Sequence, residues 1–254
     1  MQSNNKKIQY IKNAFLLAWF DTLIRYKKSF IGPFWYTITN FCGIVVFSVV
    51  WAGLVNEELD VFVPKLTVGL ILWQMISGVL TEAPRMLTEN VSMLRNVKIP
   101  LWFLTVRLMG RQLINFSHNL LLIAAVFIYY DISPGINIIY SFVGVLVLII
   151  ELSLVAHILS GVGARFRDVR FAMETFVPFL FFVSPIFFKS ESVANNLMWY
   201  NPISYMIEVV REPLLGQIPT AMLYQRFGLI VVATLLLTAV FNKIAKGKQI
   251  YWIN

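Results

Sequence analysis

The sequence predicts an all-α integral membrane protein with about six membrane-spanning helices, and three observations carry this prediction. Of the 254 residues, 58% are hydrophobic and 13% are charged, which is more apolar surface than a soluble domain of this length can bury. Long uncharged runs recur along the chain. The basic residues, which give a net charge of +8, cluster between those runs. This clustering is typical of cytoplasmic loops and argues against nucleic-acid binding.

The spans are predicted from helix length. A helix rises about 1.5 Å per residue, so about 20 apolar residues cross a hydrocarbon core of roughly 30 Å. The first four spans are predicted at residues 34–55, 66–81, 112–130 and 135–164, and the last at residues 227–242. Residues 66–81 are short, and Lys65 and Glu82 at their ends must reach toward the membrane interface.

Prolines interrupt the region between the fourth and the last span. Residues 175–188 are apolar but short and contain Pro178 and Pro185. Residues 192–207 form a second apolar stretch that is broken at Pro202. Together they predict a fifth span followed by re-entrant periplasmic helices between spans five and six, because irregular backbone in a membrane must be covered by protein.

Loop charge predicts the orientation. If both termini are cytoplasmic, the inner side holds all 21 Lys and Arg residues except Lys65, Lys189, Arg211 and Arg226. This predicts a multi-pass protein of the cell inner membrane. It also predicts one domain over residues 1–254, with a cytoplasmic interfacial helix at 1–33, a membrane bundle at 34–246 and a cytoplasmic tail at 247–254.

Two segments outside the spans have helical periodicity. In the first, apolar Ile8, Ile11, Phe15, Trp19 and Tyr26 lie opposite Lys7, Asp21, Arg25 and Lys28. This spacing favours an amphipathic helix in the inner headgroup plane over a simple basic flank. The second segment lies between Pro84 and Pro100, and is predicted as a short helix parallel to the inner surface. It suits docking into a soluble partner, and a plain helical connector is the alternative.

No catalytic or metal-binding motif is found in the sequence, so the chain is predicted not to be an enzyme. No G-x-x-x-x-G-K-[ST] motif occurs, so any ATP dependence must come from another polypeptide. His118 and His157 lie singly in apolar runs and are interpreted as packed helix residues rather than metal ligands. Glu151 is an acid near the middle of a span, for which an uncharged structural role is favoured and proton coupling is the alternative.

Four blocks of sequence carry a family resemblance. They are RYKKSFIGPFW at 25–35, NVKIP at 96–100, FRD at 166–168, and SPIF at 184–187 followed by NP at 201–202 and residues 211–216. With these blocks in this order, the chain resembles the membrane subunit of ABC-2 type exporters, specifically the group that moves O-antigen, capsule or teichoic-acid polymers. One small departure is Ile31-Gly32-Pro33, where relatives often have Leu-Gly.

The resemblance implies a homodimer joined to two copies of a separately encoded ABC ATPase. ATP and Mg would be bound by that partner, and this chain would hold no cofactor. The resemblance also implies that the interfacial helix and the first cytoplasmic loop contact the ATPase. The expected coupling surface comprises Arg25, Lys27, Lys28, Glu89, Arg95 and Lys98.

The resemblance further implies that the first and fifth spans line a channel. The candidate lining residues are Phe34, Trp35, Phe41, Phe47, Trp51, Phe176, Phe179 and Phe182. Aromatic faces can stack on the apolar C–H faces of sugar rings, which suits a polymer that must slide. The alternative is that the Trp residues belong to interfacial belts and the Phe residues face lipid.

The expected function is therefore the permease subunit of an ATP-driven exporter of a lipid-linked polysaccharide, with O-antigen and lipopolysaccharide biosynthesis ahead of capsule. Close alternatives are an ABC-2 permease for capsule, teichoic acid or a small molecule. An alternative from another class is a proton-coupled secondary transporter that uses Glu151.

Overall fold

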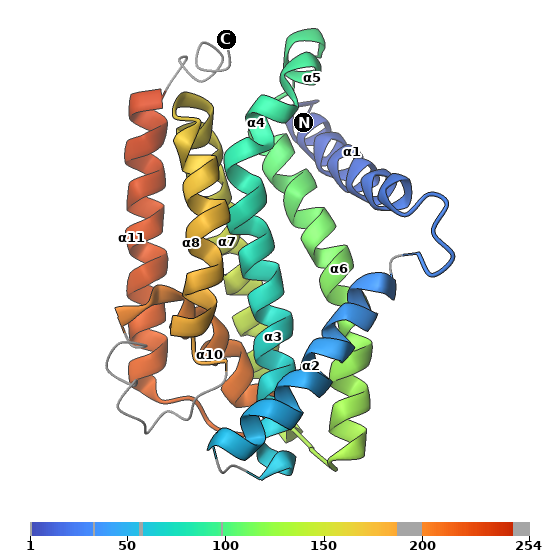
Figure 1. The fold of residues 1–254 in the computed structure, drawn as a ribbon. Coiled ribbons are helices and arrows are strands. Elements are labelled where there is room, and N and C mark those ends of the chain that lie inside the picture. The colour runs from blue at the N-terminus through green and yellow to red at the C-terminus, as the bar shows by residue number, and fades with distance from the viewer. Residues whose placement is uncertain (1, 33, 56–57, 98, 187–199, 246–254) are drawn as a thin grey trace.

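The computed structural model describes residues 2–32, 34–55, 58–97, 99–186 and 200–245, and this part of the chain is helical without a strand (Figure 1). The elements are α1 Gln2–Arg25, α2 Phe34–Val55, α3 Leu59–Glu82, η1 Ala83–Arg85, α4 Met86–Glu89, α5 Val91–Asn96, α6 Trp102–Tyr129, η2 Gly135–Asn137, α7 Ile138–Arg165, α8 Asp168–Val183, α10 Pro202–Leu214 and α11 Ala221–Ala245. The all-α prediction is confirmed.

Four described helical segments are long and apolar enough to cross a membrane. They are Leu59–Glu89, Trp102–Tyr129, Gly135–Arg165 and Ala221–Ala245. Helix α2, Phe34–Val55, has 22 residues and carries no charged side chain. Helix α8 has 16 residues and begins with charged Asp168, Arg170 and Glu174, so only its second half is apolar. The chain is an all-α integral membrane protein in which α2 and α8 join the long helices to form the bundle (Figure 1).

Helix boundaries agree with the predicted spans for α2 and for η2 with α7, and differ for α3, α6, α8 and α11. Helix α11 begins at Ala221 instead of residue 227 and ends at Ala245 instead of residue 242. Helix α3 begins at Leu59 instead of residue 66, because it lies in the middle of the bundle and packs against α2, α6, α7, α8 and α10. Neighbouring helices rather than lipid therefore surround much of it. Helix α6 begins at Trp102 instead of residue 112, so that Arg107 and Arg111 lie within a helix and not in a loop.

Helix α1 packs along the first half of α6 through small side chains. Ala14, Ala18 and Thr22 are buried one turn apart on the same face. A Cβ atom added to Gly110 of α6 would lie 2.9 Å from the Cβ of Ala18, so the glycine allows this close approach. On the predicted apolar side of the helix, Ile8, Ile11, Phe15 and Trp19 stay 42–52% exposed.

The predicted in-plane helix between Pro84 and Pro100 is instead a series of short segments. After η1, α4 ends at Asn90, whose φ of −112° and ψ of 22° break the helix before α5 begins. Segment α5 projects beyond the bundle, at the same end as the start of α1 and the end of α11 (Figure 1). The break lets the Asn90 side chain point toward α6, where it accepts a hydrogen bond from Arg107.

Helix α10 lies at the opposite end of the bundle and is buried against α3, α7 and α11 (Figure 1). Asn201 caps it, since its side-chain oxygen accepts a hydrogen bond from the Ile203 backbone N–H at 3.0 Å. Its amide donates to Ser184 Oγ at 3.1 Å, which ties α10 to the end of α8. This position agrees with the predicted re-entrant helix, and residues 187–199 of that prediction lie outside the described residues.

Candidate functional site

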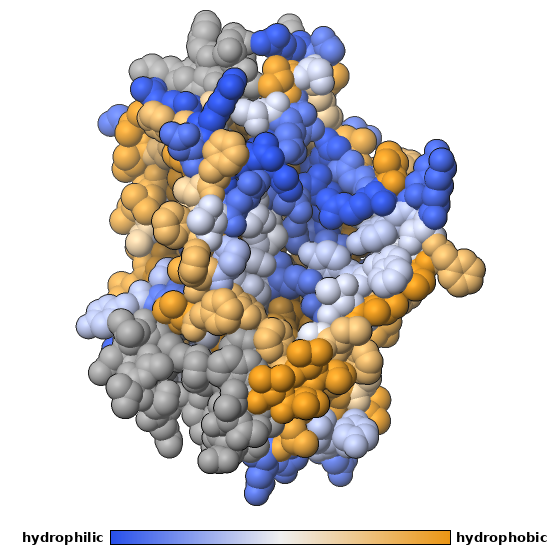
Figure 2. Space-filling model, viewed as in Figure 1, coloured by the Kyte–Doolittle hydropathy of each residue, from blue (hydrophilic) through white to orange (hydrophobic). Residues whose placement is uncertain are grey.

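A polar groove of about 600 Å³ lies between α2, α3 and α8. It is lined by Tyr36, Trp73, Gln74, Ser77, Gly78, Thr81, Glu82, Arg85, Glu174, Val177, Pro178, Phe181 and Phe182. Its polar floor arises because Gln74, Ser77 and Thr81 recur at three- and four-residue intervals and therefore share one face of α3. Figure 2 shows hydrophilic residues extending from the upper end of this side of the molecule toward its middle, between apolar surfaces.

Aromatic rings form one wall of the groove. The Phe181 ring lies 5.5 Å from Trp73 of α3, 6.1 Å from Phe47 of α2 and 5.4 Å from Phe182, measured between ring centroids. These spacings are typical of tilted and edge-to-face aromatic packing. The cluster therefore packs α2, α3 and α8 together along the aromatic wall of the groove.

The structure places the candidate channel residues in several environments. Phe182 lines the polar groove and Phe47 packs against its aromatic wall. The remaining described candidates, Phe34, Trp35, Phe41, Phe176 and Phe179, have 47–63% of their surface exposed in the single chain. The side chain of Trp51 lies outside the described residues.

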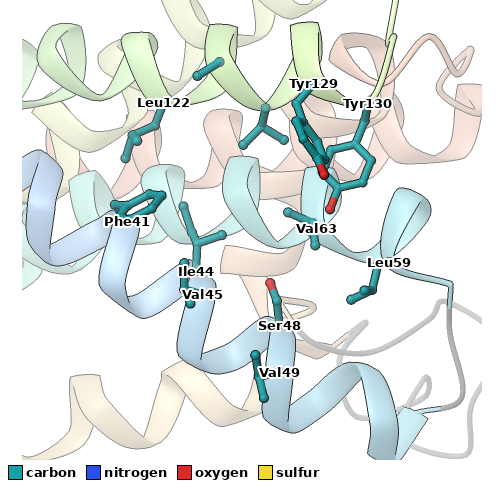
Figure 3. Close-up of a pocket in the computed structure, with 12 residues that line it drawn as sticks. Phe41, Ile44, Val45, Ser48, Val49, Leu59, Val63, Leu122, Tyr129 and Tyr130 are labelled. Atoms are coloured by element: carbon teal, nitrogen blue, oxygen red, sulfur yellow. The ribbon is translucent and has the colours of Figure 1, made fainter.

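A second groove, of about 810 Å³, is almost wholly apolar and lies between α2, α3 and α6. Figure 3 shows its lining residues, which are Phe41, Ile44, Val45, Ser48, Val49, Leu59, Val63, Leu122, Ala125, Val126, Tyr129 and Tyr130. Its few hydroxyl groups belong to Ser48, Tyr129 and Tyr130. Its lining suits hydrocarbon chains, whereas the first groove also offers amide and carboxylate groups.

Buried amides join the three helices between the two grooves. Asn40 of α2 donates hydrogen bonds to Gln74 of α3 at 2.6 Å and to Asn119 of α6 at 2.9 Å. Asn119 in turn donates to the Asn115 carbonyl at 3.0 Å. Because a buried amide without partners is costly in a membrane, these bonds fix the height and rotation of α2 against the bundle.

An ionic cluster lies beside the Glu82 end of the groove and joins α1, α3 and α6. Arg107 binds Asp21 through two hydrogen bonds, Nε to Oδ2 at 2.7 Å and Nη2 to Oδ1 at 2.6 Å. Arg111 contacts Asp21 at 3.2 Å and Glu82 at 2.6 Å. The four side chains are only 16–21% exposed. Glu82 also lines the groove, so one carboxylate belongs to both features.

Sequence reasoning missed this cluster. It expected Asp21 on the exposed side of α1, Glu82 at a membrane interface, and both arginines in a loop. The i,i+4 spacing of Arg107 and Arg111 indicates that they share a helix face, but it does not identify their acidic partners. The partners come from helices far apart in the sequence, so only the packing of α1 and α3 on α6 brings them together.

The Asp21 carboxyl provides a pH-dependent test of the cluster. Burial alone would raise its pKa, but the hydrogen bonds and positive charges of Arg107 and Arg111 outweigh burial and lower the pKa below the usual 3.8. Such a group stabilises the fold above its unfolded pKa, and this stabilisation is lost as the pH falls through the folded pKa. We expect the thermal midpoints of the wild type and Asp21→Asn to differ at neutral pH and to converge below pH 3.8. A difference that is constant over this range would contradict the ion-pair assignment.

The expected coupling residues lie on the surface where they are described. Arg25, Lys27, Lys28, Glu89 and Arg95 are all exposed, and Lys98 lies outside the described residues. Glu89 pairs with Arg85 across one helical turn at 3.6 Å. Arg25 follows Asp21 by one turn of α1, so the exposed basic end of α1 is contiguous with the ionic cluster.

Each of the two histidines and Glu151 has a hydrogen-bond partner. The His157 Nε2 lies 2.8 Å from the Asn242 side-chain oxygen, and the His118 Nδ1 lies 2.7 Å from the Ile114 carbonyl oxygen. Glu151 is fully buried on α7 and accepts a hydrogen bond from Thr234 of α11 at 2.7 Å. His157 and Glu151 therefore link α7 to α11, whereas the His118 contact stays within α6.

Comparison with known proteins agrees with the resemblance inferred from the four sequence blocks. The family described as ABC-2 type transporter matches residues 12–215, a range that includes the polar groove and the ionic cluster. One relative, the O-antigen export system permease protein RfbA of Myxococcus xanthus, is 21% identical over 184 residues, which cover 70% of this chain and 71% of the relative. The chain belongs to the ABC-2 type transporter family.

Proposed function

We propose that this chain is the permease subunit of an ATP-driven exporter that carries a lipid-linked polysaccharide, with O-antigen as the leading candidate, across the inner membrane. Membership of the ABC-2 family makes it a permease component whose ATPase is a separate subunit. The observation that carries the choice of cargo is the groove between α2, α3 and α8. It combines hydroxyl and amide groups with aromatic faces.

Two copies of the chain are proposed to act together, with both termini in the cytoplasm. A two-fold pair that brings the α2 and α8 sides of two subunits toward each other would join their grooves into one path. The exposed aromatic residues of α8, Phe176 and Phe179, would then be covered by the second copy. This arrangement would give the polymer a continuous polar path and would bury the exposed rings.

The ionic cluster offers a route by which the ATPase subunits would move the helices that line the groove. Closure of the ATPase subunits would push on the exposed end of α1 and on α4 and α5. Arg107 and Arg111 join α1 to α3 through Asp21 and Glu82, and Arg107 also holds Asn90 at the α4–α5 break. Movement of the ATPase subunits would thus be transmitted to Glu82, which lines the groove.

A genetic and a biochemical experiment test the proposal together. Deleting the gene should remove a surface polysaccharide, and its biosynthetic intermediate should accumulate on the inner leaflet. The purified chain should not hydrolyse ATP alone and should form a stable complex with a co-encoded P-loop ATPase. Failure to bind any such ATPase, or a deletion strain with unchanged surface polysaccharide, would contradict the proposal. Accessibility of a terminal tag from outside intact cells would contradict the orientation.

Replacing Glu151 separates this function from proton-coupled transport. A glutamine side chain at this position would keep the acceptor for Thr234 and match the size of an uncharged Glu side chain, so we expect export in Glu151→Gln to stay close to wild type. The change in unfolding free energy should stay within about 1 kcal/mol. Export can be measured by surface polysaccharide per cell at matched expression. Abolished export in a folded Glu151→Gln protein would favour the proton-coupled alternative.

A further inference from the structure

We propose that the polymer carried by this permease has an uncharged repeat unit, built of neutral sugars, and is not a polyanion with phosphate or uronic-acid groups along its length. The inference rests on the proposed function and specifies its substrate class. It is carried by the charges that line the polar groove and by the partners of those charges.

Acidic residues outnumber basic ones in the groove. Among the described lining residues the acids are Glu82 and Glu174, and the one cation is Arg85. The charge of Arg85 is already matched by Glu89, 3.6 Å away and one helical turn further along the chain. A polyanion entering the groove would therefore meet a cation that has its own counter-charge, beside two carboxylates.

The carboxylates are also paired, which leaves the groove close to locally neutral rather than strongly acidic. Glu82 pairs with Arg111 at 2.6 Å, from the side of α6. Glu174 pairs with Arg170 at 3.0 Å along α8. Neither arginine lines the groove, so the surface presented to a cargo is the carboxylate side of each pair.

Moving repeated negative charges through a membrane requires compensating cations along the path. Anion and phosphate pores supply them as rings of Arg or Lys side chains, because an unpaired charge in a low-dielectric region is costly. A two-fold partner repeats the lining of the first subunit, so a dimer doubles the acids as well as the cation. The path would not gain the excess of positive charge that a polyanion needs.

The remaining lining fits a neutral glycan. Gln74, Ser77, Thr81 and Tyr36 offer amide and hydroxyl groups that can exchange hydrogen bonds with sugar hydroxyls. The Trp73, Phe181 and Phe182 rings offer apolar faces on the same groove. Neither type of contact depends on a fixed charge, so successive sugars can replace one another as the chain slides.

Chemical analysis of the gene-dependent polysaccharide is the direct test. The polymer present in the wild type and absent from the deletion strain is purified and assayed for phosphate and uronic acid. We expect no anionic group in the repeat unit, with charge confined to the lipid-linked end. A polymer that depends on the gene but carries an anion in each repeat would overturn this inference and leave the proposed function standing. A deletion that changes no polysaccharide would overturn both.

A pair of charge variants at Ser77 gives a second, independent readout. Ser77→Asp and Ser77→Lys place opposite charges at the same point of the groove in the full permease–ATPase complex. For a neutral polymer, the two variants should export to the same extent, within about twofold. For a polyanion, Ser77→Asp should export at least about tenfold less than Ser77→Lys, given the strength of charge interactions at short range. That second result would overturn the inference. Detergent size-exclusion profiles check folding, and if either variant misfolds, the chemical analysis decides.

Discussion

Gly163→Ala should cost about 3 kcal/mol of unfolding free energy, the largest effect that we expect from adding a single methyl group to this protein. A Cβ atom at Gly163 of α7 would lie 2.2 Å from the Pro84 carbonyl oxygen and 2.7 Å from the Pro84 Cα. These are backbone atoms of η1, so the clash cannot be relieved by rotating a side chain. Helix α7 and η1 would have to separate where α3 passes into α4.

The measurement is the thermal midpoint of the purified protein in detergent, together with the yield of folded protein. Gly43→Ala and Gly228→Ala are matched controls, because both glycines lie in helices and a Cβ at either would have no neighbour within 4 Å. Each control should be neutral or stabilising by up to about 1 kcal/mol, since alanine favours the helix. Equal behaviour of Gly163→Ala and the controls would show that α7 and η1 do not pack this closely.

Asp21→Ala should cost about 2–4 kcal/mol, an effect comparable in size to that of Gly163→Ala. The substitution leaves Arg107 partly buried with Asn90 as its remaining oxygen partner, while Arg111 keeps Glu82. An arginine that loses its carboxylate in a region only about one-fifth exposed is poorly compensated by solvent. Helix α1 should consequently loosen from α6, and export should fall because the connection from the ATPase side to Glu82 is broken.

Two comparisons isolate the ionic contribution. Arg170→Ala breaks an i,i+4 pair whose side chains are 43% and 40% exposed, and it should cost less than about 1 kcal/mol. A double-mutant cycle of Asp21→Ala and Arg107→Ala should show a coupling energy of at least about 1 kcal/mol. Additive effects would mean that the two side chains do not interact in the folded protein, and would remove the proposed link between α1 and the groove.

The sequence predicted helix ends best for the first and the fourth span. The first span, residues 34–55, coincides with α2, and residues 135–164 match η2 and α7 to within one residue. Both helices carry long uncharged runs, so composition alone marks their ends. Helix α8 was predicted to start at residue 175 and starts at Asp168 instead, because its charged first turns lie at the end of the bundle where hydropathy is not informative.

Sequence reasoning named candidate side chains one by one, and only the structure shows which of them lie together. The sequence indicated aromatic side chains of the first and fifth spans, and the structure brings Phe47 and Phe182 to one groove with Phe181. It did not indicate Gln74, Ser77 and Thr81 as the polar floor. These residues lie in a run whose mean hydropathy is apolar. That they line a groove is evident only when the helices that pack around α3 are known.

Composition, the length of apolar runs and short motifs were enough to establish that this chain is a bundle of membrane helices and that it belongs with ABC-2 permeases. Those features are all local in the chain, so they can be read without knowing how it folds. The polar residues that share a groove and the charges that pair with one another were found only from the packing of the helices. Asp21 and Arg107 are separated by 86 positions, and contacts across such distances are set by how helices pack rather than by any local pattern.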